Sequence, residues 1–398
     1  MNVIQICSRF RRNAGVASRF TGQRLFSTPL KRNEIQVAYE PLENGDLNQD
    51  SLRSVVSQTM KVYDGTVLDT SNIHFSVVTG GITNKLYKCT LEGHSKGSIL
   101  VRIFGGEGMI DRDIETETFI ALSDQGVGAE YIGLFENGRV EGWIENANPL
   151  ELEDMGKRDV YEKVAVELAR LHQVQKKLPL SLQQHYGEPN CWAQLFSWLK
   201  QAKVSINTLE AKWGEDTAER FHEVHQAYFG EGEMGNWTLD RIEGELDALS
   251  KSIPQDLSPS VFAHNDLLAG NILLNQTSGH VHLIDFEYGG SNYRGFDIAN
   301  HWNEWAGGTQ EHMNGVCEYH RFPSENDQLQ FCQAYLQEAE GSSVGAPKLV
   351  EEANAYVLVN HWYWGLWAIN QAVMEGVDGF DYITYAESRA RQYYQCKK

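Results

Sequence analysis

The hydrophobic pattern of the chain changes once, near residue 150, and this change limits the folds that the chain can adopt. Between Ile73 and Ile144 the apolar residues occur in short β-branched and aromatic runs broken by glycine, a pattern typical of antiparallel strands. The runs are IHFSVVTGG, KLYKCTL, SILVRIF and VEGWIE. One helix is predicted among them, in DRDIETETFIALSDQG, where Gly126 would end it. After residue 156 the apolar residues recur at helical spacing instead.

These patterns predict an α+β protein with two lobes. A small lobe with an antiparallel sheet would span residues 34–145, and a larger, mainly helical lobe would span residues 146–398. The length of 398 residues agrees, because one domain typically has about 100 to 200 residues. No apolar run approaches the roughly 20 residues that a membrane-spanning helix needs, so no transmembrane segment is expected.

The charge of the chain excludes some classes of partner. The formal net charge is -20, from 54 acidic and 34 basic side chains, which would repel nucleic acids and anionic lipid surfaces. We therefore expect no nucleic-acid partner. An anionic substrate would have to be held by backbone amides, a local cation and a metal ion.

Cysteine use and the amino terminus bear on the compartment. The six cysteines are scattered without a CxxC pair, so neither a zinc site nor a disulfide framework is indicated, and a cytoplasmic location is expected. Residues 1–33 differ from the rest, with seven Arg or Lys residues and no acid. This extension fits a mitochondrial transit peptide as well as a solvated basic tail, so a mitochondrial location is the alternative.

Two apolar runs, VFAHNDLLAGNILL and VHLIDFEYGG, each carry polar side chains at or near their ends. His264, Asp266 and Asn271 form the pattern HxDxxxxN, and Asp285 follows Asp266 by 19 residues. This spacing predicts a strand-loop-strand arrangement that brings Asp266, Asn271 and Asp285 together. Each acid alone could equally serve in a turn or a helix cap.

Together these residue types suit phosphoryl transfer. A carboxylate must orient the attacking hydroxyl and accept its proton, and oxygen ligands must hold the magnesium ion that bridges the phosphates. We assign Asp266 as the base and Asn271 and Asp285 as Mg²⁺ ligands, with His264 bracing the loop. A metallohydrolase would need further histidine ligands at convincing spacing, which are not found nearby.

The predicted small lobe offers residues for a nucleotide. Gly80 and Gly81 lie between two strand-like runs, where their backbone could close over phosphates and the side chains of Thr83 and Asn84 could add polar contacts, although such a pair is often a simple turn. Arg102 in LVRIF is costly to bury without a partner. Glu115 on the predicted helix is the expected partner, in a cation–acid pair like that of kinases. A surface arginine on an edge strand is the alternative.

Three longer motifs resemble the choline and ethanolamine kinase family. They are AHNDLLAGNILL, LIDFEYGGSNYRGFDIANHWNEWAGG and NHWYWGLWAINQA, and the resemblance runs from about Val77 to Tyr394. It implies a two-lobed, protein-kinase-like fold, with ATP as cosubstrate and Mg²⁺ as cofactor. It also implies a role in the first step of the cytidine-diphosphate route to phospholipids, in which an amino alcohol is phosphorylated.

The resemblance also assigns residues. Asp266 matches the family's base, Asn271 and Asp285 match its magnesium ligands with Glu287 in support, and Arg102 and Glu115 match the pair that positions ATP. The segment from Gly142 to Ile144 matches the hinge whose backbone meets adenine. The residues that match the pocket for the ammonium group are Tyr288, Glu304, Trp364, Trp367 and Tyr385. Without the resemblance, the spacing of the two tryptophans would be read as core packing.

The motifs divide between the two substrates. HNDLL and NEWAG are similar to ethanolamine kinases. Choline kinases usually carry Cys-Gln after the base, where this chain has Leu267 and Leu268. In contrast, AGNILL and NYRGFD lean toward the choline branch. We expect ethanolamine to be preferred. The alternatives are choline, another hydroxyl acceptor of the aminoglycoside phosphotransferase type, and a pseudokinase scaffold without turnover. Homodimers occur in the choline branch, so the resemblance leaves a homodimer open.

Overall fold

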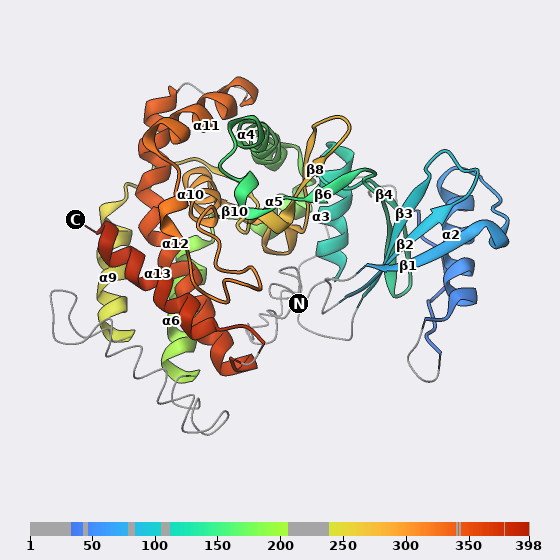
Figure 1. Cartoon of the computed structure of the whole chain (residues 1–398), viewed down its shortest axis with the longest axis horizontal. Helices are drawn as coiled ribbons and strands as arrows, with labels where there is room; N and C mark the ends of the chain where they lie inside the picture. Colours follow the sequence, from blue (N-terminus) through green and yellow to red (C-terminus); the bar gives the residue numbers. More distant parts are fainter. Residues whose placement is uncertain are drawn as a thin grey trace. The chain divides into compact units, whose positions relative to one another are not determined.

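The computed structural model describes the chain from Asn33 to Lys397 with several gaps. The described ranges are 33–42, 47–78, 84–104, 112–205, 239–339, 341, 344–377 and 379–397. The chain forms two compact units (Figure 1). The smaller unit comprises residues up to Asn148, together with Leu178–His185 and Leu273–Glu287, and the larger unit comprises Pro149–Lys177, Tyr186–Ile272 and Tyr288–Lys398.

The smaller unit is built on a five-stranded antiparallel sheet in the order β1-β2-β3-β5-β4. The strands are β1 (Ile73–Val78), β2 (Asn84–Leu91), β3 (Ser98–Phe104), β4 (Tyr131–Phe135) and β5 (Gly138–Gly142). Two helices belong to this unit, α2 (Gln49–Tyr63) and α3 (Arg112–Asp124). Helix α2 packs on β4 and adds Leu52, Val55 and Met60 to the core of the sheet.

A second, three-stranded sheet has the order β6-β8-β9 and lies almost entirely in the smaller unit. Its strands are β6 (Ala147–Pro149), β8 (Ile272–Asn275) and β9 (Val281–Leu283). Most of the short helix α5 (Leu180–Tyr186) also belongs to this unit. The predicted ligand Asp285 follows β9 by two residues.

The larger unit is mainly helical, with helices packed around α12. Its helices are α4 (Arg158–Gln173), α6 (Cys191–Ser205), α9 (Leu239–Ser252), α10 (Arg294–Glu304), α11 (Glu325–Glu338), α12 (Ala346–Glu375) and α13 (Tyr382–Cys396). Strands β7 (Ser260–Ala263) and β10 (Gly290–Tyr293) pair antiparallel. Helices α6, α10, α11 and α13 all pack against α12. Consequently α12 is buried over most of its 30 residues, as expected for a central helix.

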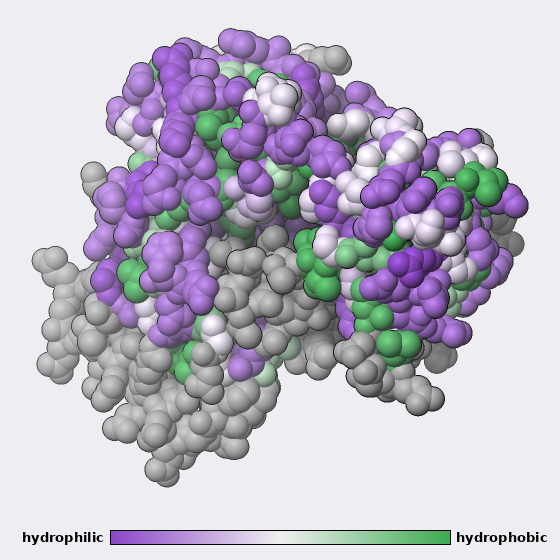
Figure 2. Space-filling view, turned by 45° about the vertical axis from the view of Figure 1, so that its right-hand side comes forward, coloured by the Kyte–Doolittle hydropathy of each residue, from purple (hydrophilic) through white to green (hydrophobic). Residues whose placement is uncertain are grey.

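The predicted fold class is confirmed. Four predicted strand runs form β1, β2, β3 and β5, and the predicted helix forms α3, followed by Gly126 with a φ of 72°. The helix α2 and the strand β4 were not predicted. In Figure 2, hydrophilic residues cover most of the visible face of the described residues, in keeping with the net charge of -20.

Some predictions fall outside the described residues. These are the basic extension before Asn33 and the phosphate contacts of Gly80, Gly81 and Thr83, while Asn84 lies in β2 without a described side chain. Within the described ranges, no helix combines the length and the apolar character needed to cross a membrane.

Candidate functional site

The loop that follows β7 carries the predicted base and is fixed through its backbone. Asp297 of α10 accepts hydrogen bonds from the backbone N–H groups of His264 and Asn265, both at 2.7 Å. Asn265 has a φ of 65°, a conformation that asparagine tolerates better than most residues. Its side chain donates to the carbonyl oxygen of Tyr288 and accepts from Asn292. The chain is therefore turned sharply one residue before Asp266.

Asp297 is itself held by a buried histidine. His172 of α4 lies 2.9 Å from an Asp297 carboxylate oxygen through Nε2, and its Nδ1 lies 2.7 Å from the hydroxyl of Tyr335. Burial would raise the pKa of Asp297, but the hydrogen bond and charge of His172 and the contacts with His264 hold that pKa below its usual value. Asp297 is thus an ionised anchor for the loop.

Asp266 and Asn271 lie together in the larger unit, and both are buried. The Asn271 amide nitrogen donates to the Asp266 backbone oxygen at 2.9 Å and lies 3.4 Å from its carboxylate Oδ2. Because the amide nitrogen is directed at Asp266, the amide oxygen of Asn271 is left to face another group. The backbone N–H of Asp266 lies 3.4 Å from Nδ1 of His264, a contact within the same loop.

A second histidine supports the same loop from α10. His301 Nδ1 lies 3.1 Å from the carbonyl oxygen of Leu267, and the indole N–H of Trp305 donates to His301 Nε2 at 3.3 Å. Burial lowers the pKa of His301 to about 4, so the ring is neutral near pH 7. A neutral ring can donate at Nδ1 and accept at Nε2, which is the pattern that these two contacts require.

In the smaller unit, Arg102 has a different partner from the one predicted. Its Nε donates to Glu141 Oε1 at 2.7 Å, so the predicted direct ion pair with Glu115 is wrong. Arg102 on β3 lies directly opposite Arg139 on β5, and Arg139 Nε donates to the same Glu141 oxygen at 2.7 Å. Two like charges facing each other across a sheet repel, and the buried carboxylate between them compensates.

Glu115 and Asp285 act on the group formed by Arg102, Arg139 and Glu141 through their charges. Glu115 pairs with Arg112 at 2.7 Å and with Arg139 at 3.5 Å. Although burial opposes it, the carboxylates of Glu141, Asp285 and Glu115 keep the pKa of Arg102 above its ordinary value. Asp285 therefore lies within electrostatic range of Arg102, in the same unit.

The remaining predicted residues of the smaller unit lie on β5 and β9 or just after them. Asp285 has a φ of 63°, a turn conformation that is uncommon outside glycine, asparagine and aspartate. Gly142 ends β5, pairs with Ile99 of β3 and donates its N–H to the Glu130 carbonyl oxygen at 2.7 Å. Ile144 and Glu287 are half-buried.

The predicted ammonium pocket lies in the larger unit as a cluster of aromatic rings. The ring of Trp364 lies 5.5 Å from Tyr288 and 5.2 Å from Trp367, and Trp367 lies 6.2 Å from Tyr385, all in edge-to-face geometry. The indole N–H of Trp367 donates to the Tyr288 hydroxyl at 3.3 Å. Trp364 is anchored by a hydrogen bond of 2.7 Å to Asn300. These rings therefore lie together in the larger unit, where both tryptophans are buried in the core.

Glu304, the predicted carboxylate of this pocket, is paired with an arginine that sequence reasoning missed. Arg389 of α13 donates to Glu304 Oε1, and its Nε donates to the Tyr385 hydroxyl at 3.0 Å. Burial raises the pKa of Glu304, and the charge of Arg389 opposes that rise. The sequence did offer a signal, because Arg389 follows Tyr385 by four residues, a spacing that places both on one face of a helix.

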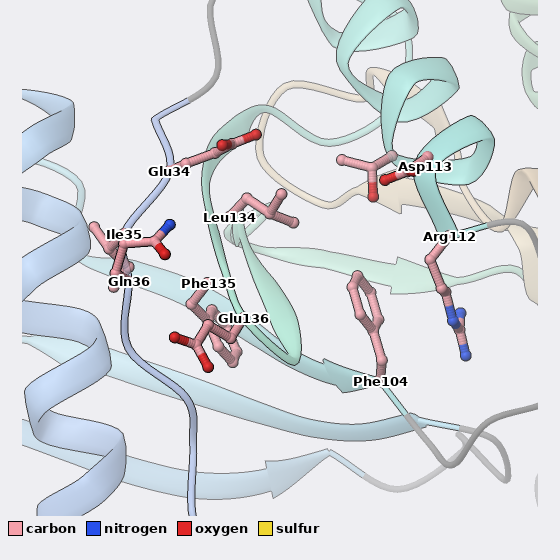
Figure 3. A pocket seen from close by; sticks show the side chains of 10 residues that line it. Glu34, Ile35, Gln36, Phe104, Arg112, Asp113, Leu134, Phe135 and Glu136 are labelled. Carbon is pink, nitrogen blue, oxygen red and sulfur yellow. The ribbon is translucent and has the colours of Figure 1, made fainter.

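The smaller unit also contains a surface hollow of about 200 Å³ (Figure 3). Phe104, Leu134 and Phe135 supply apolar lining, and Glu34, Gln36, Asp113 and Glu136 supply polar groups beside Arg112. Of the predicted site residues that the structure describes, none lines this hollow. It therefore contributes nothing to the assignment of the site.

Comparisons with known proteins agree with this geometry. The family described as choline/ethanolamine kinase matches residues 75–394. A probable ethanolamine kinase of Arabidopsis thaliana is 36% identical over 335 residues, covering 82% of this chain and 80% of that protein. Ethanolamine kinase 2 of Homo sapiens is 32% identical over 325 residues, covering 80% of this chain and 75% of that protein.

A solved choline kinase from Cryptosporidium parvum Iowa II has the same fold, with a TM-score of 0.66 at 23% identity, covering 87% of this chain and 95% of that chain. The predicted protein-kinase-like fold is thus confirmed. Since the family match spans most of the chain and both curated relatives exceed 30% identity, the protein belongs to the choline/ethanolamine kinase family.

Proposed function

We propose that the protein transfers the γ-phosphoryl group of ATP to the hydroxyl of ethanolamine, yielding phosphoethanolamine and ADP. This reaction is the first step of the CDP-ethanolamine route to phosphatidylethanolamine. Family membership supports phosphoryl transfer to an amino alcohol, and the curated relatives named as ethanolamine kinases support the choice of ethanolamine. The observation that carries the proposal is the anchored loop in which Asp266 is held beside Asn271.

In the proposed reaction, Asp266 orients the substrate hydroxyl and accepts its proton as the oxygen attacks the γ-phosphorus. The bond between that phosphorus and the bridging oxygen of the β-phosphate breaks, and ADP leaves. The contacts of Asp297 and His301 with the loop fix the carboxylate in place, so little reorganisation is required during the reaction. His264 acts through the loop and does not transfer a proton.

For the nucleotide, we propose that the smaller unit supplies the contacts. The backbone of Gly80 and Gly81 would meet the phosphates with help from Thr83 and Asn84, and the backbone of Gly142 to Ile144 would meet the adenine. Arg102 would place its charge at the phosphates, held in position by Glu141. Glu115 would act on Arg102 only through the surrounding charge cluster.

We propose Asn271 and Asp285 as Mg²⁺ ligands, with Glu287 in support. An amide oxygen and a carboxylate are ligand types that Mg²⁺ accepts, and the Asn271 amide is turned so that its nitrogen, not its oxygen, is engaged by Asp266. When bound, the ion would neutralise charge on the phosphates during transfer.

For the amino alcohol, we propose the aromatic cluster of Tyr288, Trp364, Trp367 and Tyr385, with the carboxylate of Glu304. An ammonium group is attracted to aromatic faces by about 0.5 to 2 kcal/mol per ring. Choline is the competing substrate, because aromatic rings bind a quaternary ammonium equally well and a probable choline kinase of Arabidopsis thaliana is 28% identical to this chain.

Steady-state ATP consumption by the full chain tests the proposal, comparing kcat/KM for ethanolamine and choline in the presence of Mg²⁺. We expect ethanolamine to have the higher value. A higher value for choline would leave the family assignment intact and overturn the choice of substrate. If neither were phosphorylated, a pseudokinase or a kinase for another hydroxyl acceptor would replace the proposal.

We also propose a cytoplasmic location, supported by the scattered cysteines, with mitochondria as the alternative suggested by the basic extension. Imaging of the full chain with and without residues 1–33 distinguishes the two. A homodimer, which the choline branch suggests, stays a prediction that sedimentation of the purified protein tests.

A further inference from the structure

Arg389 lies at the centre of a buried polar cluster in the larger unit that lies against the aromatic rings. The cluster consists of Glu304, Cys317, Tyr319, His361, Tyr385 and Arg389, and the side chain of Arg389 is fully buried. Its electrostatic neighbours include Tyr385, Tyr319, Glu304 and Cys317. Tyr385 joins this cluster to the rings, because it packs on Trp367 and accepts a hydrogen bond from Arg389.

Several polar atoms of this cluster have no hydrogen-bond partner within the described ranges. They are Nη1 of Arg389 and both ring nitrogens of His361, and all three atoms are buried. The hydroxyl of Tyr319 is placed to donate to the thiol of Cys317, which leaves its oxygen able to accept a hydrogen bond. The ring of Tyr319 lies 5.4 Å from that of His361 in edge-to-face geometry. Buried polar atoms without partners are unfavourable unless a water molecule or a ligand completes their hydrogen bonds. The cluster therefore has hydrogen-bonding capacity that its own side chains do not use.

The charges of the cluster point to the kind of ligand. Glu304 and Arg389 form an ion pair, so the pair is neutral overall, and only Oε1 of Glu304 has a hydrogen-bond partner in the described part of the chain. Burial and the charge of Arg389 push the pKa of His361 well below its ordinary value, so this ring adds no positive charge. The free oxygen of Glu304, the neutral ring of His361 and the Tyr319 hydroxyl can all accept hydrogen bonds.

Ethanolamine and choline differ in whether they can use such acceptors. The ammonium group of ethanolamine carries three N–H donors, whereas the trimethylammonium group of choline carries none. The aromatic rings attract both cations. A site that is built to form hydrogen bonds discriminates strongly against an analogue without the donors, because its polar groups are then left unpaired. Hydrogen-bond acceptors, rather than rings, are therefore the groups that separate the two substrates.

We propose that Tyr319 is a specificity-determining residue, whose hydroxyl accepts a hydrogen bond from a primary ammonium group bound at Glu304 and thereby favours ethanolamine over choline. This inference rests on the proposed function and assigns a role that neither the motifs nor the aromatic cluster assigned. Tyr319 lies between α10 and α11, outside all three family motifs on which the resemblance was based.

The variant Tyr319→Phe tests the inference, since it removes one oxygen atom and keeps the ring. We expect kcat/KM for ethanolamine to fall by about tenfold or more, mainly through KM, because the lost hydrogen bond involves a charged donor. The value for choline should change by less than about twofold. With N-methyl- and N,N-dimethylethanolamine, the effect of the substitution should shrink as the number of N–H groups falls.

Tyr393→Phe is the matched control, because it removes a buried tyrosine hydroxyl of the same unit that bonds to Glu245 at 2.9 Å, away from the cluster. We expect it to leave the ratio of the two substrates unchanged. An unchanged ratio in Tyr319→Phe, or an equal loss for all four amino alcohols, would overturn the inference while the proposed function stood. Failure of the wild-type protein to phosphorylate either substrate would instead overturn the proposed function itself.

Discussion

Asp266 lies in a loop whose backbone is held by Asp297 and His301. Because these contacts do not involve the Asp266 carboxylate, we expect the protein to stay folded when that carboxylate is replaced. The substitution Asp266→Asn keeps the shape of the side chain but removes the proton acceptor. We expect kcat to fall by about 10²- to 10⁴-fold, while ATP affinity measured by calorimetry changes little. Asp256→Asn, an exposed acid of the same unit, is the control and should keep full turnover. Retained turnover in Asp266→Asn would contradict the assignment of the base.

Glu141 is the residue on which the arginine pair of the small unit depends. Burial alone would raise its pKa, but the charges and hydrogen bonds of Arg102 and Arg139 lower it to about 2. A carboxyl group with a lowered pKa stabilises the folded state above its unfolded pKa, and that stabilisation is lost as pH falls toward the folded pKa. The stabilisation that Glu141 contributes is therefore lost as the pH falls from about 4.5 to about 2.

Glu141→Gln should destabilise the protein at pH 7 by roughly 3 kcal/mol, because the buried Arg139 and the half-buried Arg102 lose their counter-charge. Urea unfolding of the wild type and the variant measures this difference. The difference should narrow as pH falls below about 4.5, since only the wild type loses stabilisation there. A difference that stays constant between pH 7 and pH 3.5 would show that Glu141 does not carry this charge coupling.

At the scale of single residues, the sequence indicated that Arg102 needs a partner but did not identify that partner. Arg102 does form an ion pair, and its partner is Glu141. Its partner depends on the register of β3 against β5, which places Arg139 opposite Arg102 and brings Glu141 between them. Contacts between strands set such a register, and the sequence of either strand alone does not reveal it.

At the scale of elements, the sequence of helix α2 has a pattern from which the helix could have been predicted. Its buried residues Leu52, Val55, Val56, Thr59 and Met60 follow helical spacing, and Asn48 caps the helix by accepting from the N–H of Ser51. Strand β4 was harder to predict, because it has five residues and an irregular register with β5 between Tyr131 and Gly133. Short strands of this kind are defined by their neighbours more than by their own sequence.

The close approach of α10 to α12 gives a prediction about helix packing. A Cβ atom on Gly295 would lie 2.9 Å from the Glu352 carbonyl oxygen and 2.9 Å from a ring carbon of Tyr356. Gly295→Ala should therefore push the two helices apart and destabilise the protein by about 1 to 3 kcal/mol. Thermal unfolding of the purified variant measures the loss.

Gly244→Ala on α9 is the matched control, because nothing lies within 4 Å of the added Cβ there. Alanine favours a helix over glycine by up to about 1 kcal/mol, so this variant should be as stable as the wild type or more stable. If both variants behaved alike, the contact between α10 and α12 would not limit the size of residue 295.

At the scale of the whole molecule, the two units are not contiguous in sequence. The segments Leu178–His185 and Leu273–Glu287 belong to the smaller unit although both follow the start of the larger one. Texture along the chain predicted a single boundary, because periodicity reports local structure and not which unit a segment joins. Because Leu273–Glu287 belongs to the smaller unit, the predicted ligand Asp285 lies in a different unit from the predicted ligand Asn271.

Asp285 gives a prediction that involves the stability of the whole protein. A ligand that binds only the folded state raises stability by about 2.7 kcal/mol at 100 times its dissociation constant. If Asp285 holds Mg²⁺, ATP with Mg²⁺ should raise the unfolding temperature of the wild type, and chelation of the metal should remove most of that rise. Asp285→Ala should lose the metal-dependent part of the rise, as measured by differential scanning fluorimetry.

The control for this experiment is Asp124→Ala, which removes an exposed carboxylate at the end of α3 in the same unit. It changes the net charge by the same amount, so it separates metal binding from general electrostatics. The control should keep the full metal-dependent rise. If Asp285→Ala also kept that rise, Asp285 would not be a ligand. Its turn conformation beside Arg102 would then need a purely structural explanation, because aspartate at a φ of 63° is retained only where surrounding contacts favour it.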